Sequence, residues 1–71
     1  MSYWSKLAEM FGLQLGDSFH VIDSFGIELS GTFWFEDSGL FYFNNGRQYS
    51  GIDTADSLFQ LLNGKYTVER C

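Results

Sequence analysis

The chain has 71 residues, a formal net charge of −5 and one cysteine, Cys71. A chain of this length forms one domain, here residues 1–71, and a single cysteine excludes an internal disulfide. The sequence contains neither an apolar run long enough to span a membrane nor a recognisable signal peptide. We therefore expect a cytoplasmic protein with no membrane partner.

Aromatic side chains are the main material for a hydrophobic core. The chain contains eight phenylalanines, four tyrosines and two tryptophans, and each such side chain buries about 150–250 Å² in a folded protein. The four lysines and arginines are scattered along the chain, whereas neutralising phosphates needs clustered positive charge. We therefore expect no direct nucleic-acid partner. The acidic balance either favours basic partners or belongs to an ordinary solvated surface.

The first predicted element is a short helix near the N-terminus. Ser2 is suited to cap its start and Gly12 to end it. Its apolar face has the i, i+3, i+4, i+7 spacing of an amphipathic helix and consists of Trp4, Leu7, Ala8 and Phe11.

Two strands are predicted next. Ser18–Asp23 is the first, with Phe19 and Val21 on one side. Ile27–Glu36 is the longest, and its alternating pattern is typical of a sheet with one buried face. Asp37-Ser38-Gly39 then fits a three-residue hairpin loop, in which the last residue has a positive φ that favours glycine.

This three-residue loop predicts the register of the hairpin and therefore the face of every side chain. It pairs Glu36 with Leu40, Phe35 with Phe41, Trp34 with Tyr42, and Phe33 with Phe43. That register places the four phenylalanines on the core face and puts Thr32, Trp34, Leu40 and Tyr42 on the opposite face. A loop one residue shorter or longer would mix the two faces.

A second turn at Asn44-Asn45-Gly46 leads to the strand that contains Tyr49. A two-residue loop would place Tyr49 beside Tyr42 on the outer face, and a three-residue loop would place it beside Phe41 in the core. The sequence does not decide between these two registers.

The C-terminal third predicts a second helix and a last strand. Asp53 or Thr54 caps the helix, which ends at Asn63-Gly64. Its predicted apolar stripe is Ala55, Leu58, Phe59 and Leu62. Lys65–Arg70 forms the strand, with Tyr66 and Val68 inward. The order α-β-β-β-β-α-β predicts an α+β fold, a small antiparallel-rich sheet of four to five strands packed with two short helices.

No group of residues has a catalytic or ligand-binding pattern. His20 lies in a predicted strand and Cys71 at the chain end, whereas a nucleophilic pair must be held rigidly in hydrogen-bond reach. The carboxylates lie mostly at turns and caps, where they serve the backbone, and no calcium loop or nucleotide-binding loop is present. We therefore expect no enzyme activity, no metal and no cofactor.

The candidate functional site is the outer face of the predicted sheet. It consists of Thr32, Trp34, Leu40 and Tyr42, with Tyr49 added if the second loop has two residues. Grouped aromatic side chains on a sheet face are typical of a recognition surface, which favours binding of another protein. The alternatives are coverage by the chain itself, self-association as a homodimer, and stacking of a small ligand or a single nucleic-acid strand.

Four segments carry a family resemblance: Tyr3-Trp4 with Lys6-Leu7 and Met10-Phe11-Gly12, then Leu15-Gly16-Asp17-Ser18-Phe19, then Gly31 to Tyr42, and Leu61-Leu62-Asn63-Gly64-Lys65-Tyr66 with Val68-Glu69. Together they resemble an uncharacterised family of small phage and prophage proteins from Gram-positive bacteria. That family has no established activity, so the resemblance assigns no site residues. Its members continue into a basic tail with tryptophan and proline, so we expect a shorter variant or a fragment here. The resemblance implies a phage accessory protein in a bacterial cytoplasm that acts by binding, for instance by inhibiting a host or defence factor.

Overall fold

The computed structural model describes residues 2–71 and begins with helix α1, Tyr3–Met10. Ser2 caps this helix, because its Oγ accepts a hydrogen bond from the amide of Ser5 at 3.1 Å. All four residues of the predicted apolar face are buried or pack against the core. The first predicted helix is therefore confirmed in its start and its buried face.

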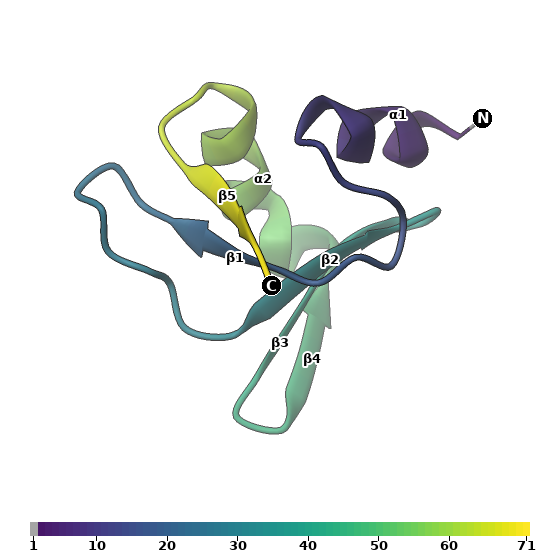
Figure 1. Ribbon diagram of the computed structural model, residues 1–71. Helices are drawn as coiled ribbons and strands as arrows, with labels where there is room; N and C mark the ends of the chain where they lie inside the picture. Colours follow the sequence, from purple (N-terminus) through teal and green to yellow (C-terminus); the bar gives the residue numbers. More distant parts are fainter. Residues whose placement is uncertain (1) are drawn as a thin grey trace.

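Within residues 2–71 the strands form one antiparallel five-stranded sheet in the order β4-β3-β2-β1-β5. The strands are β1 (Phe19–Ile22), β2 (Thr32–Glu36), β3 (Gly39–Asn44), β4 (Arg47–Ser50) and β5 (Thr67–Arg70). A 3-10 turn, η1 (Gly51–Thr54), leads into helix α2 (Ala55–Leu62), and the chain then returns to place β5 beside β1 (Figure 1). The predicted α+β class and the predicted element order are confirmed.

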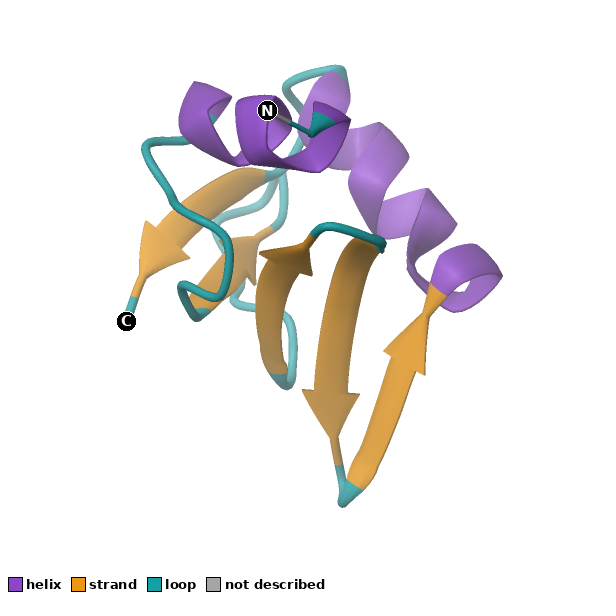
Figure 2. Ribbon diagram, turned by 90° about the vertical axis from the view of Figure 1, so that its right-hand side faces the viewer, coloured by secondary structure: helices purple, strands orange, loops and turns teal. Residues whose placement is uncertain are grey.

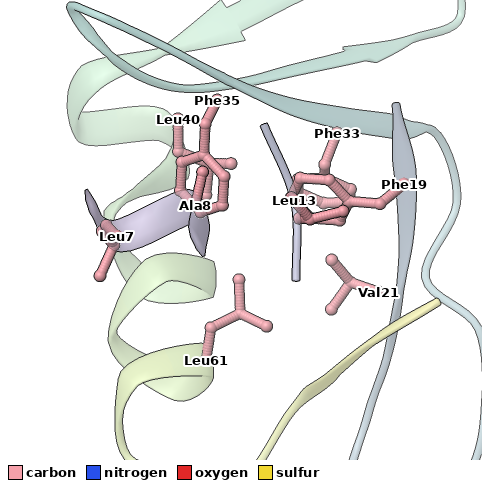
Figure 3. Close-up of a cluster of buried hydrophobic side chains, with 9 residues drawn as sticks. All are labelled: Leu7, Ala8, Leu13, Phe19, Val21, Phe33, Phe35, Leu40 and Leu61. Atoms are coloured by element: carbon pink, nitrogen blue, oxygen red, sulfur yellow. The ribbon is translucent and has the colours of Figure 1, made fainter. Parts of the chain in front are cut away.

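Both helices lie on one side of the sheet, above the strands in Figure 2. The core between these layers is drawn in Figure 3 and consists of Leu7, Ala8, Leu13, Phe19, Val21, Phe33, Phe35, Leu40 and Leu61. Phe19 stacks on Phe33 and Phe35, with ring centroids 5.9 and 5.4 Å apart. The centre of the fold is therefore a group of phenylalanines that the helices cover.

The first hairpin has a two-residue loop, which corrects the predicted register. Glu36 pairs with Gly39, so only Asp37-Ser38 forms the turn. Gly39 has the expected positive φ (143°) but belongs to the strand. It is buried under helix α1, where a β-carbon would lie 3.7 Å from Cζ2 of Trp4. Gly39 is therefore a strand residue on which the indole of Trp4 packs, and it is not part of the loop.

A shift of one residue exchanges the two faces of β3. Leu40 and Tyr42 now point to the same side as Phe33 and Phe35, and Phe41 shares the opposite side with Trp34. The sequence of β3 is apolar at successive positions, so its own alternation does not select a face. Contacts with the helices select it instead, because Leu40 is 2 % exposed and belongs to the core.

The strand predicted over Ile27–Glu36 is only half formed, since β2 begins at Thr32. Ile27 is exposed, and Glu28 makes only an isolated bridge with Ile22. Gly31 separates this segment from β2 because its φ is +93°, a conformation that side-chain-bearing residues rarely adopt. A β-carbon there would also lie 2.7 Å from the carbonyl oxygen of Phe43.

The second hairpin has the two-residue loop Asn45-Gly46, in which both residues have positive φ. Strand β4 therefore pairs Tyr49 with Tyr42, one of the two registers left open by the sequence. Both tyrosines lie on the core side of the sheet, because the first hairpin is shifted.

Helix α2 buries a different stripe from the predicted one. Leu61 is 2 % exposed, whereas Phe59 is 61 % and Leu62 47 % exposed, and Ala55 is exposed as well. Of the predicted stripe only Leu58 packs against the core. The helix is apolar on two sides, so its periodicity permits two orientations, and its attachment to the sheet decides between them.

Candidate functional site

The structure does not bring the five predicted site residues together. Thr32 and Trp34 lie on the outer face of β2, as predicted, and are partly exposed. Leu40 is buried in the core, and Tyr42 stacks on Phe33 with centroids 4.7 Å apart. The predicted Trp34–Tyr42 neighbourhood is therefore wrong, because these two side chains point to opposite sides of the sheet.

Tyr49, the fifth predicted site residue, also lies on the core side of the sheet. Its ring stacks on Tyr42, with centroids 5.2 Å apart. The two tyrosines thus extend the phenylalanine layer toward the sheet edge at β4 and take no part in the outer face.

The side of the sheet opposite the helices carries a different set of residues, which we call the outer face. Strand pairing assigns to it His20, Ile22, Thr32, Trp34, Glu36, Phe41, Phe43, Gln48, Ser50, Thr67 and Glu69. No helix of residues 2–71 covers this side. Its aromatic members lie on the central strand β2 and on its neighbour β3.

Trp34 and Phe41 form the centre of the outer face. Their rings stack across the two strands, with centroids 5.7 Å apart and planes 20° apart. Phe43, two residues further along β3, is 47 % exposed. Sequence reasoning missed both phenylalanines because it assigned them to the core with a register one residue away.

The indole of Trp34 is held by its own strand. Its Nε1 donates a hydrogen bond to Oε2 of Glu36, 2.6 Å away. Residues i and i+2 of a strand share a face, which is why this pair can form. The bond fixes the ring orientation and leaves the second oxygen of the carboxylate available.

An open hollow of about 570 Å³ lies beside the indole. It is lined by Leu15, Gly16, Ser18, Trp34, Glu36 and Asp37. The segment before β1 reaches this place because the amide of Gly16 donates a hydrogen bond to the carbonyl of Phe35 at 2.8 Å. Two small residues, Gly16 and Ser18, thus lie near a large aromatic ring and leave the space between them open.

Carboxylates dominate the charge of the outer face. Glu36 and Glu69 belong to it, and Glu28 adjoins it through the bridge to Ile22. The two arginines that lie in strands, Arg47 and Arg70, have the opposite parity and point to the other side. Among residues 2–71, no lysine or arginine nitrogen lies within 4.0 Å of these carboxylates.

Among the described residues, His20 is the one basic side chain that strand pairing assigns to this face, and it lies near Glu28. Its Nδ1 is 3.7 Å from Oε2 of Glu28, too long for a hydrogen bond. That Nδ1 atom is buried without a hydrogen-bond partner among the described residues. In residues 2–71 no cluster of three metal-ligating side chains accompanies it.

Comparisons with protein-family models, with curated proteins and with solved structures found no match to this chain. The resemblance to small phage proteins therefore stays a prediction. Among residues 2–71, no helix is long and apolar enough to cross a membrane. The geometry of the outer face is thus the main basis for a functional proposal.

Proposed function

We propose that the chain is a non-enzymatic protein-binding domain whose outer face docks a basic protein partner. The observation that carries this proposal is the aromatic row of Trp34, Phe41 and Phe43 on a sheet face that neither α1 nor α2 covers. Aromatic residues are enriched at the centre of protein interfaces, where they supply contact area and anchor points.

Charge selects the partner. The outer face and its border carry Glu28, Glu36 and Glu69 without lysine or arginine, and the whole chain has a formal charge of −5. Like charges brought face to face cost binding energy, whereas opposite charges speed association and set the register. Two copies of this face would oppose carboxylates, so a basic partner is favoured over the homodimer.

The resemblance to small phage proteins supports a setting for this binding. In that setting the domain acts in a bacterial cytoplasm as a phage or prophage accessory protein, and its partner is a host or defence protein with a basic surface. The net negative charge of the chain supports a partner with a basic surface.

A displayed library of random peptides tests the proposal. We expect the selected sequences to be enriched in lysine and arginine and to bind more weakly at higher salt. Trp34→Ala and Phe43→Ala should each weaken binding about tenfold or more, as loss of an interface aromatic does. Phe59→Ala removes an exposed aromatic ring from helix α2 instead and should leave binding unchanged.

Three results would overturn the proposal: no selected peptide, selected peptides without excess positive charge, or equal effects of Phe43→Ala and Phe59→Ala. Sedimentation over a dilution series decides the alternative. A concentration-dependent dimer that Trp34→Ala abolishes would assign the outer face to a second copy of the chain.

A further inference from the structure

We infer that the hollow beside Trp34 is an anchor pocket for a single arginine side chain of the partner. This inference rests on the proposed function, because it names the chemical group of the basic partner that the outer face would bind. Four observations support it: the shape of the hollow, its charge, the hydrogen-bonded indole and the position of the chain's two arginines elsewhere.

The shape of the hollow leaves one side of the indole accessible. Strand β2 lies between β3 and β1, and Phe41 on β3 covers the indole from one side. The hollow opens on the other side, toward Gly16 and Ser18 in the segment before β1. A flat group that enters the hollow can therefore stack on the indole opposite Phe41.

The charge of the hollow favours a cation. Glu36 and Asp37 both line it, and among residues 2–71 neither makes an ion pair. The neighbouring carboxylate of Asp17 differs, because Arg70 already lies 3.2 Å from it. The two carboxylates of the lining thus remain without an opposite charge of their own.

Arginine fits this combination better than lysine does. A guanidinium is planar, stacks on aromatic faces and presents a fork of donors that matches a carboxylate. An ammonium is a compact, strongly hydrated charge with no flat face. The hydrogen bond between Trp34 and Glu36 holds the stacking surface and the acceptor in place beforehand, which lowers the ordering cost of binding.

The arginines of the chain itself do not serve as the occupant. The side chain of Arg70 forms an ion pair with Asp17. Arg47 lies beside the β3–β4 turn, where it is opposite Asn44 in the strand register. An arginine in the hollow therefore comes from another molecule.

Titration of the isotope-labelled full chain with N-acetyl-arginine N-methylamide tests the inference by NMR. We expect saturable movement of the Trp34 indole Nε1–H signal, with the Trp4 indole as an internal reference that does not move. The lysine derivative should bind more weakly, and the uncharged citrulline derivative should produce no shift. Equal responses to arginine and citrulline, or equal movement of both indoles, would overturn the assignment.

A matched pair of variants separates the hollow from the general charge of the face. Glu36→Gln keeps an acceptor for the indole but removes the charge, and it should weaken arginine binding about fivefold. Glu69→Gln removes the same charge from the outer face outside the hollow and should change the affinity less than about twofold. Equal losses would contradict an anchor pocket.

The two proposals fail in different ways. Basic peptides that bind the outer face and respond equally to Glu36→Gln and Glu69→Gln would refute the arginine pocket and keep the docking function. Arginine binding in the hollow without any selected basic peptide would refute the docking function and keep a small guanidinium site.

Discussion

The hydroxyl of Thr54 donates a hydrogen bond to the backbone carbonyl of Leu40, 3.0 Å away, at the buried junction of helix α2 with strand β3. The carbonyl of Gly51, 3.1 Å away, is a second acceptor for the same hydroxyl. Thr54 is 3 % exposed and is the only buried polar residue among residues 2–71. This contact ties the start of α2 to the sheet, so Leu58 and Leu61, one and two turns later, face the core.

Thr54→Val should lower the free energy of unfolding by about 1–3 kcal/mol, because it removes the donor from a buried carbonyl while keeping the shape of the side chain. Urea denaturation measures this change. Thr67→Val makes the same substitution at an exposed position of β5 and should stay within about 0.5 kcal/mol of the parent. Similar effects at both positions would contradict an anchoring role for Thr54.

Gly31→Ala should be more destabilising than Gly26→Ala. Both glycines have a positive φ, +93° and +82°, so both substitutions strain the backbone by about 1–2 kcal/mol. Only Gly31 lacks room, since its β-carbon would lie 2.7 Å from the Phe43 carbonyl oxygen, whereas at Gly26 nothing lies within 4 Å. The difference in unfolding free energy between the two variants should be about 1–3 kcal/mol.

Urea denaturation of Gly31→Ala and Gly26→Ala measures this difference in the free energy of unfolding. Equal destabilisation by the two alanines would show that the chain adjusts freely around Gly31. The close approach of Gly31 to β3 would then be unnecessary for the sheet.

Sequence patterns predicted the buried side correctly in strand β1 and in helix α1. Phe19 and Val21 alternate with less buried residues in β1, and the buried face of helix α1 follows one helical stripe. Patterns failed where both sides are apolar. In β3 the residues from Leu40 to Phe43 are apolar or aromatic on both sides of the strand. In α2 two adjacent leucines, Leu61 and Leu62, are both candidates for the core.

The two leucines of α2 allow a direct measurement of this point. Leu61→Ala should cost about 2–5 kcal/mol, as for other buried leucines, because the side chain is 2 % exposed. Leu62→Ala, with 47 % exposure, should cost less than about 1 kcal/mol. A larger loss of stability for Leu62→Ala than for Leu61→Ala would support the apolar stripe of α2 that the sequence predicted.

The candidate site was predictable only in part, for the same reason. Thr32 and Trp34 alternate with Phe33 and Phe35, so the outer position of Trp34 follows from the sequence alone. Which residue of β3 lies beside Trp34 depends on whether the hairpin loop has two or three residues, and local patterns did not decide the loop length. The hollow depends on a contact between Gly16 and β2, two segments that no sequence pattern relates.

A double-mutant cycle tests the pairing on which the outer face depends. Trp34→Ala and Phe41→Ala should show a coupling free energy of about 0.5–1.5 kcal/mol, since their rings stack across the strands. The cycle of Trp34→Ala with Tyr42→Ala should be additive to within about 0.5 kcal/mol, because these side chains lie on opposite faces. If the larger coupling appeared between Trp34 and Tyr42, the hairpin would have a three-residue loop, Phe41 would belong to the core, and the outer face described above would not exist.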